Sequence, residues 1–130
     1  MKKQGFSLLE LLVVIGIISL LLSVAISSYS TAQKKTRDAK RQADLKTIQQ
    51  SAEQYYSICG FSYPNFAGGA LQPIICTTSS PTQVILPTEK LPKDPKTNNV
   101  YTCYGSCTTS SFTLCATPEL ANSICVSSQQ

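Results

Sequence analysis

The feature that most constrains this chain is a long apolar run with a single carboxylate inside it. Residues 6–26 read FSLLELLVVIGIISLLLSVAI, and Glu10 is the one charged side chain among these 21 residues. A helix needs about 20 apolar residues to cross the hydrocarbon core of a bilayer. The run therefore predicts a transmembrane helix. Because a charge inside such a helix is costly to insert, Glu10 is a candidate functional residue, unless it merely snorkels to water near the membrane edge.

A cleavable secretory signal is the competing interpretation of this run. Such a signal has an apolar core of about 7–15 residues followed by a cleavage site with small residues at fixed positions. The run here is longer, and the sequence SVAISS at residues 23–28 matches such a site poorly. The length therefore favours a membrane-spanning segment.

The helical pattern continues without a break beyond the apolar run. Residues 27–58 contain no proline or glycine, and Leu45, Ile48, Ala52, Tyr55 and Cys59 follow one another at spacings of three and four. This spacing predicts an amphipathic helix over residues 27–58 that buries one stripe. Residues 6–58 would then form one helix of about 53 residues, roughly 80 Å long.

A run of charges occupies the other sides of the amphipathic segment. We expect most of these side chains to form a solvated helix face, and binding to anionic lipid or to DNA is the alternative. The run consists of Lys34, Lys35, Arg37, Lys40, Arg41 and Lys46, with Asp38 and Asp44 among them.

The residue composition of the sequence changes after Cys59. Residues 59–86 are rich in Gly, Pro, Ser and aromatic residues and are expected to form a loop region. Later segments alternate or are rich in β-branched and aromatic residues, which predicts short antiparallel strands at 84–87, 100–104, 111–117 and 124–128. The expected fold class is α+β, with residues 59–130 forming a small globular head packed on the C-terminal half of the helix.

All six cysteines lie in the C-terminal part of the chain, and this predicts a disulfide-stapled head in an oxidising compartment. Six cysteines allow 15 pairings. We favour Cys59 with Cys76, Cys115 with Cys125 and therefore Cys103 with Cys107; a Cys107–Cys125 bond is the alternative. No metal site is expected, because the chain contains no histidine and no C-x-x-C pair.

The composition argues against catalysis and against a cofactor. Without histidine there is no side chain poised for acid–base work at neutral pH, and the cysteines have no imidazole to activate them. The formal net charge of +4 is too small to indicate a nucleic-acid partner by itself, so nucleic acid remains an unsupported partner.

The N-terminal residues resemble the class III signal peptide of type IV pilins and pseudopilins. KKQG followed by FSLLELLVVIGIISLLLSVAI matches the family at Gly5, Phe6 and Glu10 and along the apolar segment. The resemblance implies a leader of residues 1–5, cleavage by a prepilin peptidase between Gly5 and Phe6, and N-methylation of Phe6. It also implies a type IV pilin fold, and pairing of the Glu10 carboxylate with the N-terminal amine of a neighbouring subunit.

The resemblance implies a precursor that crosses the plasma membrane once with its head outside, and afterwards a homo-oligomeric helical filament built by pilus assembly machinery. Lysine and arginine are more numerous after the apolar run than before it, which by itself would place the head in the cytoplasm. The cysteines argue for the opposite orientation, and we follow them.

Three functions remain open at the level of sequence. The first is a structural subunit of an extracellular type IV pilus. The second is a pseudopilin of a type II secretion or DNA-uptake machine, which the LPKDP sequence at residues 91–95 favours. The third is a signal-anchored surface protein that never polymerises. Pseudopilins often bind calcium near this turn, but Asp94, Thr97, Asn98 and Asn99 offer one carboxylate only, so a calcium site is not expected.

Overall fold

The structure is a computed structural model that describes residues 5–66, 69–105 and 107–130. Residues 1–4, which include most of the expected leader, lie outside the described residues. The chain divides into two compact units, residues 1–35 and residues 36–130. The first unit is helical from Leu8 onward, whereas the second combines the remainder of the same helix with all the strands.

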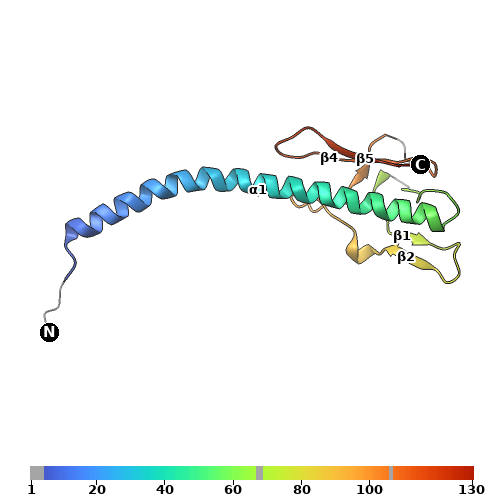
Figure 1. Ribbon diagram of the computed structural model, residues 1–130, viewed down its shortest axis with the longest axis horizontal. Coiled ribbons are helices and arrows are strands. Elements are labelled where there is room, and N and C mark those ends of the chain that lie inside the picture. The colour runs from blue at the N-terminus through green and yellow to red at the C-terminus, as the bar shows by residue number, and fades with distance from the viewer. Residues whose placement is uncertain (1–4, 67–68, 106) are drawn as a thin grey trace. The chain divides into compact units, whose positions relative to one another are not determined.

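One helix, α1, runs over Leu8–Ile58 (Figure 1). It begins two residues later than expected, where Ser7 and Glu10 form one of the two bonds of a capping box. Ser7 stands at the N-cap position, and its backbone N–H donates to Glu10 Oε2 at 3.4 Å. This pairing of a serine with a glutamate three residues later marks a helix start.

The C-terminal end of α1 is a Schellman motif. Gly60 adopts a left-handed conformation with φ of 82°, which glycine reaches without a side-chain clash. The N–H of Phe61 then reaches back to the carbonyl of Tyr56 at 3.1 Å. The rings of these two residues lie 5.7 Å apart, which is the apolar contact that accompanies the motif. The helix therefore stops at Ile58 for a local reason.

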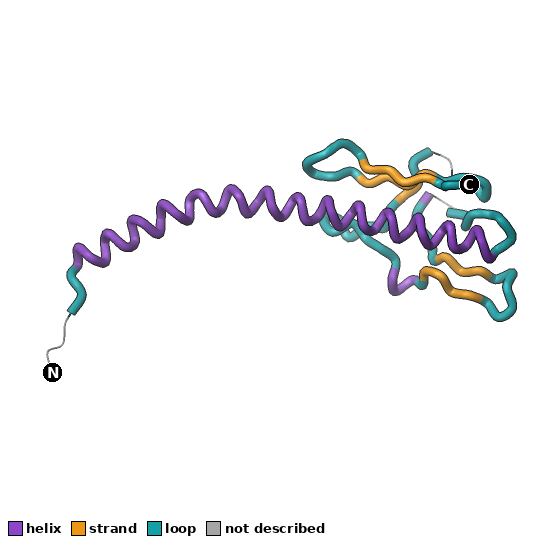
Figure 2. The backbone as a smooth tube through the Cα atoms, viewed as in Figure 1, coloured by secondary structure: helices purple, strands orange, loops and turns teal. Residues whose placement is uncertain are grey.

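The strands form two small antiparallel sheets, one on either side of the C-terminal part of α1 in Figure 1. One sheet pairs β1 (Ile74–Cys76) with β2 (Gln83–Leu86). The other has the order β3-β4-β5, with β3 at Thr102–Cys103, β4 at Thr113–Ala116 and β5 at Ile124–Ser127 (Figure 2). A short 3₁₀ helix, η2 (Thr88–Lys90), follows β2.

One expectation about the strands needs refinement. Residues 59–86 are not only a loop region, because β1 lies within them as Ile74–Cys76. The expected α+β class is confirmed, and the antiparallel strands of the head are divided between two separate sheets. The isolated run Ile74-Ile75-Cys76 is too short to show a clear period of two, so the sequence pattern could not separate it from its turn-rich surroundings.

The core lies between one stripe of α1 and the inner faces of the sheets. Leu45, Ile48 and Ala52 are fully buried, which confirms the stripe predicted from their spacing. On β4 the buried residues alternate, with Leu114 and Ala116 facing inward. The remaining buried members of this cluster come from all parts of the head: Tyr63, Phe66, Leu71, Ile74, Leu86, Tyr101 and Phe112.

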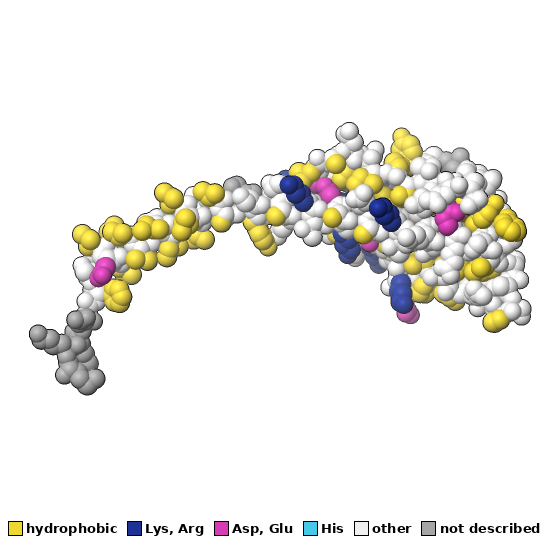
Figure 3. Space-filling model, viewed as in Figure 1, with side chains coloured by type: hydrophobic (Ala, Val, Ile, Leu, Met, Phe, Trp, Pro, Cys, Tyr) yellow, Lys and Arg dark blue, Asp and Glu magenta, His cyan; other side chains and the backbone are white. Residues whose placement is uncertain are grey.

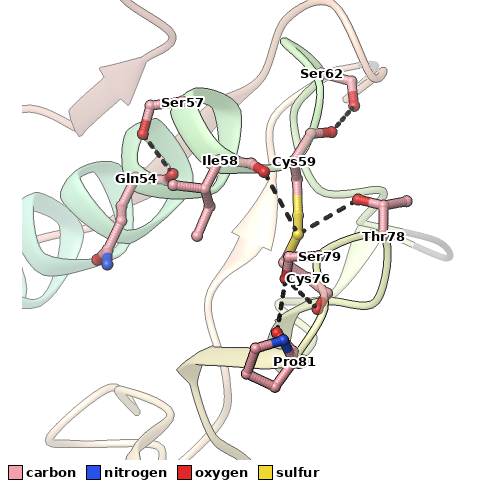
Figure 4. The surroundings of a disulfide bond; sticks show 9 residues. All are labelled: Gln54, Ser57, Ile58, Cys59, Ser62, Cys76, Thr78, Ser79 and Pro81. Carbon is pink, nitrogen blue, oxygen red and sulfur yellow. Dashed lines mark hydrogen bonds between the residues drawn. A yellow bond between two sulfur atoms is a disulfide. The ribbon is translucent and has the colours of Figure 1, made fainter.

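The six cysteines form three disulfides: Cys59–Cys76, Cys103–Cys107 and Cys115–Cys125. This is the first of the two connectivities considered from sequence. Cys59–Cys76 joins the residue after α1 to the end of β1 (Figure 4). Cys115 and Cys125 are direct cross-strand partners on β4 and β5. Each bond therefore ties together segments of a head whose core is small.

Candidate functional site

The first compact unit presents an apolar surface along its helix (Figure 3). Fifteen large apolar side chains of residues 6–26 are exposed, from 48% at Ile18 to 88% at Phe6. By length and composition this helix is able to cross a membrane. Its serine hydroxyls donate to carbonyls of the helix itself, as Ser19 Oγ does to Ile15 O at 2.7 Å. Polar groups so satisfied fit an apolar solvent.

Gly5, Phe6 and Glu10 lie together at the beginning of this surface. Gly5 and Phe6 precede the helix, and no heavy atom lies within 4 Å of the place where a Cβ on Gly5 would stand. The backbone at this junction is therefore open to approach. The Glu10 carboxylate accepts the long bond from the Ser7 N–H and forms no ion pair with any described residue.

Residues 1–26 match the family described as the prokaryotic N-terminal methylation motif. They are the class III signal peptide of type IV pilins. The match covers Gly5, Phe6, Glu10 and the whole apolar run, and it indicates a type IV pilin-like precursor. Such precursors are structural proteins. No curated protein and no solved structure matches the chain.

The pilin-like chain also contains a feature that sequence analysis missed, an ion-pair cluster around Arg41. This side chain is only 2% exposed, although we expected it on a solvated face. Its Nε donates to Asp94 Oδ2 at 2.6 Å, and its Nη1 donates to Asp38 Oδ1 at 2.6 Å. Asp38 lies one turn earlier on α1, whereas Asp94 lies in the turn before β3. The guanidinium therefore joins the helix to a distant segment.

Two further cations, Arg37 and Lys96, extend this cluster by pairing with Glu119 in the C-terminal part of the chain. Arg37 Nε donates to Glu119 Oε1 at 2.6 Å, and Lys96 Nζ lies 3.4 Å from Glu119 Oε2. The Asp38 carboxylate also accepts the backbone N–H groups of Glu119 and Leu120. The Arg41 cluster, defined as Arg37, Asp38, Arg41, Asp94, Lys96 and Glu119, thus holds three cations and three carboxylates, with a formal charge of zero.

The cluster shifts the titration of its carboxyl groups. Hydrogen bonding to the Arg37 guanidinium lowers the pKa of Glu119 from its usual 4.5 to about 2. Hydrogen bonding to Arg41 likewise lowers the pKa of Asp94 well below its usual value. Partial burial alone would raise the pKa of Asp38, but its bonds to the Glu119 N–H, Arg41 and the Leu120 N–H lower it overall. All three carboxylates are therefore held in the charged form.

The contacts of Asp94 also bear on the calcium alternative. Besides Arg41, its Oδ1 accepts the backbone N–H groups of Lys96 and Thr97 at 2.8 and 2.9 Å. Both oxygens of the one carboxylate in the 94–99 turn are thus already bound by protein donors. Among the residues that the structure describes, no group of three acidic, histidine or cysteine side chains is arranged to hold a metal ion.

Two further contacts fasten the head to α1. The Glu53 carboxylate accepts the Tyr63 hydroxyl at 3.0 Å and the backbone N–H of Gln129 at 2.9 Å. The Asp44 carboxylate accepts the hydroxyl of buried Tyr101 at 2.9 Å, and burial raises the pKa of that hydroxyl. These acidic groups are therefore used inside the fold.

The sequence contains a local signal for one part of the Arg41 cluster only. Asp38 and Arg41 stand at i, i+3 on a helix, a spacing at which opposite charges meet. Asp94 and Glu119 lie 53 and 78 residues beyond Arg41. No local pattern links residues so far apart, so the burial of Arg41 followed only from the three-dimensional structure.

Proposed function

We propose that the chain is a structural subunit of an extracellular type IV pilus. In this proposal a prepilin peptidase cleaves between Gly5 and Phe6, and the new N-terminus at Phe6 is methylated. The subunit waits in the plasma membrane with its head outside, and assembly machinery then transfers it to the filament. Its partners are other copies of the same chain.

The observation that carries the proposal is the methylation-motif match on residues 1–26. Within this segment, residues 8–26 are helical, and their apolar side chains are exposed and require a cover. Lipid supplies this cover before assembly and neighbouring helices supply it afterwards. Because lipid is as apolar as the helices, packing and polar contacts must favour the assembled state.

Glu10 supplies such a polar contact in the proposal. Cleavage would leave a cationic amine on Phe6 near the N-terminus of a helix, where the helix dipole disfavours positive charge. The bond from the Ser7 N–H to Glu10 is 3.4 Å long and leaves the carboxylate free to accept a stronger donor. Pairing of Glu10 with the Phe6 amine of another copy would compensate both charges and set the register of the incoming subunit.

The three disulfides support the outside location of the head, because such bonds persist in oxidising compartments. A role as a pseudopilin remains the second candidate, because the LPKDP sequence at residues 91–95 leads into a turn at residues 94–99, in which Asp94 N–H donates to Asn99 O at 2.9 Å.

The proposal is tested by mass spectrometry of filaments sheared from cells. We expect a chain that starts at Phe6, carries one additional methyl group and lacks six hydrogens for three disulfides. A Gly5→Val variant should remain uncut in the membrane, because the peptidase needs open backbone there. A mature chain beginning beyond residue 26 would contradict the proposal. Recovery of the cleaved chain only from the cell envelope, and never from sheared filaments, would favour the pseudopilin.

A Glu10→Gln variant separates processing from assembly. It should be cleaved and methylated normally, because Glu10 lies beyond the cut, but its yield in sheared filaments should fall at least tenfold, about the effect of losing 1.4 kcal/mol. Glutamine keeps the size and the capping hydrogen bond but loses the charge. Ser19→Ala, a polar change in the same apolar segment, serves as the matched control and should leave the filament yield unchanged. Equal yields from Glu10→Gln and wild type would contradict the pairing.

A further inference from the structure

The structure divides the charge run of residues 34–46 into two sets with different surroundings. Arg37 and Arg41 form ion pairs with carboxylates of the Arg41 cluster. Lys34 and Lys35, in the first compact unit, form no ion pair with any residue that the structure describes. The charge of these two lysines is therefore available to a partner outside the chain.

The polar groups next to these lysines lie on the helix at membrane-interface distance. Counted along the helix axis from residue 26, Tyr29 lies about 4 Å, Thr31 about 7 Å and Lys35 about 13 Å further on. The polar layer of a bilayer extends roughly 5–7 Å beyond the hydrocarbon core on each side. Lysine stems snorkel toward that layer, so both ammonium groups can reach it.

One helix face gathers hydrogen-bond donors for a phosphate. Ser28, Thr31 and Lys35 follow at spacings of three and four, and together with Ala32 they line one shallow depression. Tyr29, which is 67% exposed, stands beside them and has the amphipathic ring that is enriched at membrane interfaces. The Ser28 hydroxyl donates to Val24 O at 3.4 Å, so the Thr31 hydroxyl and the Lys35 ammonium group are the donors that this face offers to the oxygens of a phosphate.

We propose that Ser28, Thr31, Lys34 and Lys35 form a binding surface for anionic phospholipid headgroups in the outer leaflet. It would hold the unassembled subunit at a fixed depth in the membrane, and assembly would have to release it. The proposal rests on the proposed function in taking residues 6–26 as the membrane span and in placing the head outside. DNA also contains phosphates. However, the surface follows directly after the apolar span, so lipid headgroups lie next to it whenever the span is in a membrane.

Native mass spectrometry of the full chain tests this surface. The chain is released from non-ionic detergent containing equal amounts of phosphatidylglycerol and phosphatidylcholine, and the bound lipids are counted. We expect the wild type to retain phosphatidylglycerol preferentially. Because a lysine near an anionic surface contributes about fivefold in affinity, Lys34→Gln with Lys35→Gln should weaken this retention roughly twenty-fold. Thr31→Val should weaken it less, because the lysines remain.

The matched control is Lys90→Gln with Lys93→Gln, which removes the same charge from two exposed head lysines without ion pairs among the described residues. It should retain lipid like the wild type. Equal retention of both lipids by the wild type, or equal loss in both double variants, would overturn the proposal. A third contradictory outcome concerns DNA. If Lys34→Gln with Lys35→Gln lost binding to a duplex oligonucleotide but retained lipid like the wild type, the lysines would bind DNA and not lipid. None of these readouts depends on filament formation, so the pilus proposal stands or falls separately.

Discussion

Replacement of Arg41 by methionine is expected to lower the free energy of unfolding of residues 36–130 by about 3 kcal/mol, as is usual when one partner of a buried ion pair is removed. Methionine keeps much of the buried apolar stem but loses the guanidinium. Asp94 and Asp38, whose side chains are only 17% and 13% exposed, would then lose their common cation. The change in the free energy of unfolding is measured by urea unfolding of the full chain in detergent. The near-ultraviolet circular dichroism of the head tyrosines monitors the transition.

Lys40→Met is the matched control for this experiment. Lys40 precedes Arg41 on the same helix, is exposed and forms no ion pair with a described residue. Its replacement should change the free energy of unfolding by less than about 0.5 kcal/mol. If the two variants unfolded at the same urea concentration, Arg41 would be an ordinary surface cation and its burial would contribute nothing.

The pH dependence provides a second check on the same cluster. A carboxyl group with a lowered pKa in the folded state stabilises the fold above its unfolded pKa, and this contribution disappears as the pH falls through the folded pKa. The carboxyl groups whose pKa Arg41 lowers are Asp94 and Asp38, and their usual pKa is 3.8. The guanidinium of Arg41, whose own pKa is raised, stays charged over this range. The difference between wild type and Arg41→Met should therefore be constant from pH 7 to 5 and shrink as the pH falls below 3.8.

The parts of the fold that the sequence predicted are those with local causes. The apolar run, the stripe of Leu45, Ile48 and Ala52, and the end of the helix near Gly60 are all visible within a few residues. The helix, the buried stripe and the α+β class follow from such patterns. Short alternating segments likewise indicated β4 and β5 to within two residues of their observed ends.

The parts that the sequence did not predict depend on contacts between distant residues. In the sequence, Arg41 resembles any other cation of a charged helix. Its burial depends on ion pairs with the distant residues Asp94 and Glu119. β1 is three residues long and gains its definition from pairing with β2 across the turn that follows Cys76. The Ser7–Glu10 bond, by contrast, is local, because a serine followed three residues later by a glutamate is a sequence signature of a helix start.

Under the proposed function, Glu10 has two uses that act on the same carboxylate. In the uncleaved chain it caps α1 by accepting the Ser7 N–H. Under the proposed function it also receives the cation of a neighbouring N-terminus. A capping box contributes modestly, and a charge-assisted bond in an apolar surrounding is shorter and stronger. Exchange of the weaker partner for the stronger one would favour assembly without any rearrangement of the helix.

Replacement of Phe112 by alanine should destabilise the head by about 4 kcal/mol, within the range found when large aromatic side chains are removed from cores. Phe112 is 1% exposed, and its ring lies edge-on to Tyr63 at 5.0 Å and to Phe66 at 5.8 Å. The buried cluster contains twelve residues, so few neighbours remain to collapse into the cavity. Urea unfolding in the same detergent measures this loss.

Tyr104→Ala provides the control, because this aromatic ring is 72% exposed and its removal should cost less than about 0.5 kcal/mol. Phe112→Leu, which keeps most of the volume, should cost about 1.5 kcal/mol. Since small domains are stable by only about 5–15 kcal/mol in total, the alanine variant would leave the head strongly dependent on its three disulfides. We therefore expect a mild reductant to unfold Phe112→Ala while the wild-type head stays folded. Resistance of both proteins would mean that the head needs neither the Phe112 side chain nor the disulfides to stay folded.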